Sequence, residues 1–199
     1  MGGVAGVFTA FGLSGSAGLN AYLPLLIVAL LARFFPSLVP LNEPWTALTS
    51  WWTIGVLVVL LIVETVADKV PAVNHVNDVI QTFIRPAAGA ILFAASSNVI
   101  ADIHPVFALV CGILVAGSVH LVKSAAIRPV VTAVSAASSG GVATGPANVV
   151  ISTVEDVVSI ITSLLAVVVP FILALVLLIA VFAIAWWLLN QQNARHQRA

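Results

Sequence analysis

Apolar runs long enough to cross a lipid bilayer recur along this chain, and they constrain its fold more than any other feature. A helix needs about 20 mostly apolar residues to span the hydrocarbon core. Only 7% of the 199 residues are charged, whereas an ordinary soluble domain has roughly 25%. Seven basic and seven acidic residues cannot form the polar shell of a soluble globule. A soluble enzyme, a nucleic-acid binder and a disordered protein are therefore disfavoured, and we expect an all-α, polytopic membrane helix bundle.

The apolar runs predict about six transmembrane helices in two groups of three. The first group spans about 6–32, 51–67 and 86–100, and the second about 106–122, 129–145 and 157–189. The two three-helix units cover 1–101 and 102–190, and a polar tail follows over 191–199. Two alternatives stay open: the fifth segment either crosses or re-enters, and the last is either one helix bent at Pro170 or two spans.

Residues 72–85 form no span but carry a polar stripe. Asn74, Asp78, Gln81 and Arg85 fall at positions i, i+4, i+7 and i+11, opposite a stripe of valine, isoleucine and phenylalanine. This periodicity predicts an amphipathic helix. Such a helix either lies on the membrane with its polar face in water or covers a permeation path.

The second half of the chain repeats this spacing. Asn148, Ser152, Glu155 and Ser159 fall at the same intervals in a mildly amphipathic segment over about 147–156, and each stripe follows a proline. Three spans in each half would make the two units inverted with respect to each other. Inverted repeats with broken helices are a common plan of transporters, with the site near the midplane. Coincidence is the alternative, because helical periodicity alone makes matching stripes common.

The basic residues predict an orientation. With six crossings, one side of the membrane receives only Arg33, and the other receives Lys69, Arg85, Lys123, Arg128, Arg195 and Arg198. Cytoplasmic loops carry an excess of lysine and arginine. We therefore expect both termini in the cytoplasm, and Glu155 and Asp156 on the opposite side.

Small and polar residues crowd the first and fifth predicted spans. A glycine-broken polar stretch is tolerated at membrane depth only where it faces protein or water. We predict that these residues line a path for an ion or solute, with close helix packing as the alternative. The candidates are Ser14, Ser16, Asn20, Ser138, Ser139 and Asn148.

Ionisable groups in or beside spans are costly, so each is a candidate functional residue. Glu64 and Asp68 lie at i and i+4 beside Lys69. They predict a cation or proton site at an inner mouth, or else a helix end satisfied by water, Lys69 or Arg85. Asp78 and Arg85 would line a lid or a solvated face.

His120, Lys123 and Arg128 flank the entry to the fifth span. They would attract an anionic headgroup or substrate, or else set the topology with side chains that reach the interface. Glu155 and Asp156 precede the last long span, where acidic residues complement a helix N-terminus.

Motifs of enzymes and metal sites are missing from the sequence. It contains no GxSxG, HExxH or P-loop pattern. The single cysteine, Cys111, excludes an internal disulfide and a cysteine-based metal cluster. We expect neither an enzyme nor a cofactor or metal.

Several pieces of the chain together resemble the DUF4126 family of bacterial integral membrane proteins. They are the segments 12–24, Asp68-Lys-Val-Pro71, Arg85-Pro86, His120-Leu-Val-Lys123 with Arg128, and Ser152-Thr-Val-Glu-Asp156. The resemblance implies a small, multi-pass protein of the bacterial inner membrane and supplies no activity.

Two functions fit these patterns. The first is a transporter or channel-like permeation protein for an unidentified ion or small solute, built as a homodimer. The second is a non-transporting protein that binds lipids or organises partners in the bilayer. Membrane lipids are the expected partners in either case, and no nucleic acid is expected.

Overall fold

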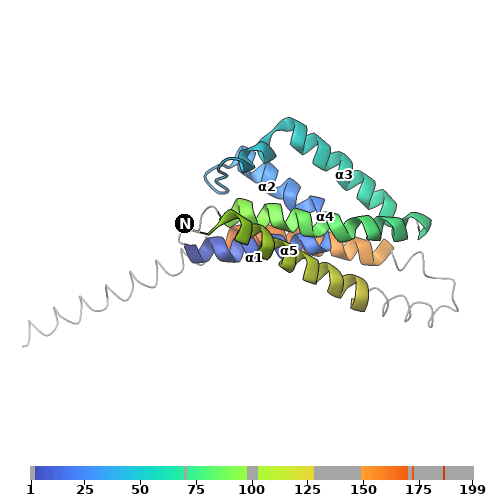
Figure 1. The fold of residues 1–199 in the computed structure, drawn as a ribbon. Helices are drawn as coiled ribbons and strands as arrows, with labels where there is room; N and C mark the ends of the chain where they lie inside the picture. The colour runs from blue at the N-terminus through green and yellow to red at the C-terminus, as the bar shows by residue number, and fades with distance from the viewer. Residues whose placement is uncertain are drawn as a thin grey trace, which may run out of the picture.

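The computed structural model describes residues 3–69, 71–97, 103–127 and 149–169, together with Ile172 and Trp186. These residues are helical apart from short connections, and no strand occurs among them. The helices are α1 (Gly3–Leu19), α2 (Tyr22–Phe34), the 3₁₀ turn η1 (Trp45–Thr49), α3 (Trp51–Lys69), α4 (Pro71–Ser97), α5 (Pro105–Val122), the π-helical turn η2 (Lys123–Ile127) and a helix over Val149–Val169. Figure 1 shows them as one bundle.

Four helical segments are long and apolar enough to cross a membrane. They are Trp51–Asp68, Val76–Ser96, Pro105–Ala125 and Val149–Val169. The expected all-α, polytopic membrane bundle is thus confirmed for the part of the chain that the structure describes. The predicted spans at 129–145 and beyond residue 169 lie outside the described residues, apart from Ile172 and Trp186.

The first predicted span, about 6–32, is two helices and not one. Its two apolar parts, Gly6–Leu19 and Tyr22–Phe34, are each shorter than the about 20 residues that a spanning helix usually needs. The break is at Asn20, whose side-chain carbonyl accepts hydrogen bonds from the backbone N–H groups of Tyr22 and Leu23, at 3.0 Å each. An asparagine oxygen in this place satisfies donors that a helix start leaves open. The chain then turns back, so α1 and α2 form a helical hairpin (Figure 1).

The predicted amphipathic helix 72–85 and the third span are one continuous helix, α4, with Pro86 in its interior. Prolines are tolerated inside membrane helices where the surrounding protein satisfies the freed backbone groups. In the same way, the described part of the predicted amphipathic segment 147–156, from Val149 on, is continuous with the start of the last span in the helix Val149–Val169.

The polar face of α4 points into the bundle. Gln81 and Arg85 are each 1% exposed, whereas Phe83 is 75% and Val76 60% exposed. Of the two alternatives for this stripe, a face in water at the membrane surface does not hold for Gln81 and Arg85. A helix surrounded by lipid places its apolar side outward and its polar side toward its protein neighbours.

Small residues bring α1, α4 and α5 into close contact. A Cβ atom added to Gly112 of α5 would lie 2.4 Å from the carbonyl oxygen of Gly89 in α4. One added to Gly18 of α1 would lie 2.5 Å from the carbonyl oxygen of Ala116. Such approach of backbones is the usual basis of helix association in membranes.

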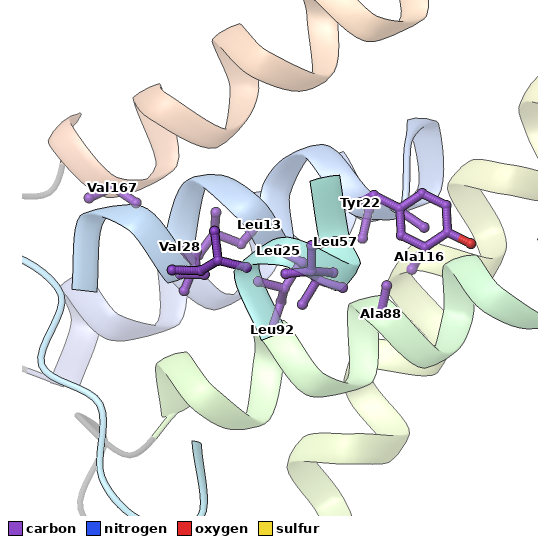
Figure 2. Close-up of a cluster of buried hydrophobic side chains, with 13 residues drawn as sticks. Leu13, Tyr22, Leu25, Val28, Leu57, Ala88, Leu92, Ala116 and Val167 are labelled. Atoms are coloured by element: carbon purple, nitrogen blue, oxygen red, sulfur yellow. The ribbon is translucent and has the colours of Figure 1, made fainter. Parts of the chain in front are cut away.

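An apolar core fills the space between α1, α2, α3 and α4. Leu13, Leu25, Leu57 and Leu92 lie along it (Figure 2). Tyr22 is at one end of this row, and its hydroxyl group points away from the other labelled side chains (Figure 2). The core therefore ends at Tyr22, where the polar residues described below begin.

The opposite end of the bundle carries Arg33. Its guanidinium group lies 4.2 Å from the ring centre of Trp51 and donates a hydrogen bond to the carbonyl of Thr49 at 2.6 Å. These contacts fix the end of α2 to the start of α3. Trp51 and Trp52 are exposed, as expected of aromatic anchors at a headgroup boundary.

Candidate functional site

Charged and amide side chains gather at one end of the bundle, which we call the polar cluster. At this end α1, α3 and α5 finish and α2, α4 and Val149–Val169 begin, toward the right of Figure 1. The side chains are buried or partly buried. The polar cluster consists of Asn20, Tyr22, Glu64, Asp68, Asn77, Gln81, Arg85, His120, Lys123, Ser152, Glu155 and Asp156.

Arg85 lies at the centre of the polar cluster. Its Nη2 donates to Glu64 Oε1 at 3.1 Å, and its Nη1 donates to the Gly18 carbonyl at 3.4 Å. The same Nη1 lies 3.4 Å from Nδ1 of His120. Because an arginine only donates, Nδ1 is the acceptor and the proton of the neutral imidazole is assigned to Nε2. That nitrogen lies 3.2 Å from the hydroxyl of Thr82, which donates to the Asp78 carbonyl.

Lys123 makes the second ion pair. Its Nζ lies 2.6 Å from Glu155 Oε2 and donates to the Leu19 carbonyl at 3.0 Å. Lys123 and Arg85 thus bind successive carbonyl groups at the end of α1. These carbonyls have no partner within the helix, and basic groups complement the negative end of its dipole.

Two aspartates link the remaining helices. Asp68 of α3 accepts hydrogen bonds from Asn77 at 2.7 Å and from Ser152 at 3.1 Å, one on each oxygen. Asn20, at the break between α1 and α2, donates to Asp156 Oδ1 at 2.9 Å. All the long helices therefore contribute to one network.

The described residues of the polar cluster include several charged groups. Glu64 and Glu155 are paired with Arg85 and Lys123, whereas Asp68 and Asp156 accept hydrogen bonds from hydroxyl and amide groups. Removing a charge from water costs several kcal/mol even after relaxation. Buried charges within membrane helices are therefore an expensive feature.

A polar seam continues from the polar cluster along α1. The hydroxyl of Ser16 is 2.8 Å from that of Ser159 and 2.7 Å from that of Ser163. Farther along, Thr9 donates to the Ala166 carbonyl at 2.9 Å. The seam is closely packed at its middle, because a Cβ on Gly12 would lie 2.6 Å from that of Ala166.

Half of the predicted candidates meet in the polar cluster. They are Asn20, Glu64, Asp68, Arg85, His120, Lys123, Glu155 and Asp156. Ser16 belongs to the seam, and Ser14 donates to the Gly89 carbonyl at 2.7 Å where α1 crosses α4. Asp78 is half-buried on α4, and Lys69 is the last residue of α3. Arg128, Ser138, Ser139 and Asn148 lie outside the described residues.

The structure contradicts two predicted arrangements relative to Lys123. Glu155 and Asp156 lie at the same end of the bundle as Lys123 and not on the opposite side, because Glu155 pairs with Lys123. The start of α1 lies at the other end, because α1 runs parallel to α5 and stops beside Lys123. A cytoplasmic start of α1 and a cytoplasmic Lys123 therefore cannot both hold.

Some members of the network were not among the predicted candidates. Asn77 completes an i, i+4, i+8 row with Gln81 and Arg85, and this row is the buried one. Ser163 extends the spacing of Ser152 and Ser159 by one turn. These patterns are visible in the sequence. The roles of the Gly18 and Leu19 carbonyls are not, because they depend on the break at Asn20.

The described residues offer no metal site: no group of three or more histidine, cysteine, aspartate or glutamate side chains among them could hold an ion. The fold and the polar cluster define a polytopic membrane protein with a buried, carboxylate-rich network at a helix break. The family model of the domain of unknown function DUF4126 matches residues 7–191, so the chain belongs to this family. No curated protein and no solved structure matches it.

Proposed function

We propose that the protein is a transporter or channel-like permeation protein for an ion or small solute, and that the polar cluster binds the cargo or a coupling ion. The observation that carries this proposal is the burial of three carboxylates (Glu64, Asp68 and Glu155) and two basic side chains (Arg85 and Lys123) among membrane helices. Ionisable groups in such places mark ion pathways and proton relays in membrane proteins.

Helix packing does not account for the polar cluster. Membrane helices associate through small residues, and α1, α4 and α5 already meet at Gly18, Gly89 and Gly112. Buried ion pairs are often no more stable than apolar residues of similar volume. A function that uses the charges is the better explanation.

The break between α1 and α2 supports the same function. It directs the carbonyl groups of Gly18 and Leu19 into the polar cluster. Transporters commonly bind ions with the carbonyl ends of discontinuous helices and with the side chains beside them.

The ion pairs favour a cation or a proton as the cargo. In the part of the chain that the structure describes, the two basic side chains of the polar cluster, Arg85 and Lys123, are bound to carboxylates. Lys123, an earlier candidate for anion binding, is therefore occupied by Glu155.

Transport in reconstituted vesicles tests the proposal. The full chain is inserted into liposomes, and the movement of protons, alkali cations, anions and neutral solutes is followed with entrapped dyes or isotopes. We expect flux of a cation or proton, and a loss of at least tenfold in Glu64→Gln. Glu43→Gln makes the same chemical change in an exposed loop and should retain flux. No movement of any solute by a folded, inserted protein would refute transport and leave lipid binding or a scaffold role.

We place the protein in the bacterial inner membrane, as a homodimer among lipids and without enzymatic activity. Among the described residues, the end of the bundle with the polar cluster contains Lys69, Arg85 and Lys123, against Arg33 at the other. The excess of basic residues favours the cytoplasm for the cluster end. The inverted repeat stays a prediction.

A further inference from the structure

The buried atoms of the polar cluster without a hydrogen-bond partner among the described residues include three on α3 and α4. They are Glu64 Oε2, Gln81 Oε1 and Arg85 Nε, and each of these side chains is at most 2% exposed. Buried polar atoms are nearly always paired, so an exception calls for an explanation. Two of the three atoms are oxygens. The amide oxygen of Gln81 can only accept a hydrogen bond, and Glu64 Oε2 can only accept as long as the carboxyl is ionised.

The three atoms belong to neighbouring side chains. Gln81 and Arg85 are one turn apart on the buried face of α4. Arg85 pairs with the other oxygen of Glu64 at 3.1 Å. Tyr22 lies close to Gln81 and within the electrostatic reach of Glu64 and Arg85. Glu64 Oε2 is thus in the same part of the polar cluster as Gln81 Oε1, the amide oxygen without a partner among the described residues.

Asp68, one turn farther along α3, is a contrasting case. Both of its oxygens accept hydrogen bonds, from Asn77 and from Ser152. Both oxygens of an ionised Asp68 therefore have a hydrogen-bond donor. In Glu64 only Oε1 has a donor among the described residues.

We propose that Glu64 is the proton-binding group of the polar cluster, and that its protonated Oε2 donates to Gln81 Oε1. The proton passes from a hydronium ion to the carboxylate, one O–H bond forms and a water molecule remains. A carboxylic acid has one donor where the carboxylate has none. A single proton therefore gives both oxygens a partner.

A proton fits this place better than a metal cation. Hard cations take about six or more oxygen ligands, and α3 and α4 offer two such oxygens at this place among the described residues, Glu64 Oε2 and Gln81 Oε1. The guanidinium of Arg85 is bound to the same carboxylate and would repel a metal ion. In the part of the chain that the structure describes, the charged and titratable groups within electrostatic reach of Glu64 are Arg85 of α4, Tyr22 of α2, Asp68 of its own helix and Lys123 of α5.

Protonation of Glu64 would act on the helix break. It removes the negative charge that holds Arg85 to α3, while Arg85 keeps its contact with the Gly18 carbonyl. Charge changes at a buried pair are a common way to bias a two-state element. The inference deepens the proposed function by naming the coupling ion, and its transport role rests on that function.

Infrared difference spectroscopy of the full-length protein in detergent tests the inference without transport. Spectra are taken over a pH series in H₂O and D₂O. We expect a carboxylic-acid C=O band that exchanges slowly with D₂O, disappears on alkalinisation and is absent from Glu64→Gln. The glutamine keeps the shape of the side chain and can still contact Arg85. Glu43→Gln should keep the band, because exposed Glu43 exchanges quickly. Size-exclusion profiles establish that the variants are folded.

A second variant tests the acceptor. In Gln81→Leu the band should remain and move to higher wavenumber, because its hydrogen bond is lost. A band unchanged in Glu64→Gln, or one that sodium displaces at constant pH, would overturn proton binding at Glu64. An unmoved band in Gln81→Leu would overturn the donation to Gln81. If the Glu64 band is present but vesicles show no flux, the proton site stands and the transport function fails.

Discussion

At the scale of single residues, Arg85 and Lys123 make the same two kinds of contact at neighbouring places. Each binds a carboxylate of another helix and a carbonyl at the end of α1. The end of α1 is therefore stabilised by two cations that are themselves stabilised by Glu64 and Glu155. Because each group depends on another, removing one member affects the rest of the polar cluster.

Lys123→Met tests this dependence. The change removes the ammonium partner of Glu155, and breaking a buried pair costs about 3–5 kcal/mol. Lys123→Met/Glu155→Met removes both charges and should cost less than Lys123→Met alone. Chemical unfolding in detergent micelles measures both. If the effects of Lys123→Met and Glu155→Met on the free energy of unfolding simply add up in the double variant, the pair contributes no coupling energy.

The sequence identifies the residues of this network better than their partners. Glu64, Asp68, Arg85, Lys123 and Glu155 are predictable because ionisable groups are rare and costly within apolar runs. Their pairing depends on contacts between helices far apart in the chain, such as Lys123 with the Leu19 carbonyl. A single sequence contains no signal for such contacts.

At the scale of helices, α4 shows why the side that a stripe faces is hard to predict. The sequence correctly predicts the period of its polar residues, but the period alone does not say which face of the helix contacts the neighbouring helices. In water the apolar face is buried, and in lipid the polar face is. The hairpin of α1 and α2 is hard to predict for a related reason. The break between the two helices depends on two hydrogen bonds to one asparagine side chain, Asn20.

Gly112→Ala tests the close contact of α4 and α5. The added Cβ would lie 2.4 Å from the Gly89 carbonyl oxygen and 2.6 Å from Cα of Ala90, so the helices must separate. Overpacking of this kind costs about 1–3 kcal/mol. Gly55→Ala is a matched control, because its Cβ meets nothing within 4 Å and alanine favours a helix by up to about 1 kcal/mol. Thermal unfolding in detergent should show a lower midpoint for Gly112→Ala only; equal midpoints would contradict the close approach.

At the scale of the whole molecule, the bundle has two unlike ends. One contains the polar cluster with Lys69, Arg85 and Lys123, and the other contains Arg33 and the exposed tryptophans. The hairpin places the first residues of α1 at the Arg33 end (Figure 1). This difference between the ends makes orientation measurable with three positions.

Cysteines introduced one at a time into a Cys111→Ala background test the orientation. Positions Gly3 and Phe34 lie at the Arg33 end, and Ala125 lies beside the polar cluster in η2. A membrane-impermeant maleimide should label positions 3 and 34 in intact cells, and position 125 only after permeabilisation, because the basic end favours the cytoplasm. Labelling of 125 from outside, with 3 and 34 protected, would reverse the orientation and preserve the hairpin. Labelling of 3 and 34 from opposite sides would instead require the segment from α1 to α2 to cross the bilayer, which contradicts the hairpin.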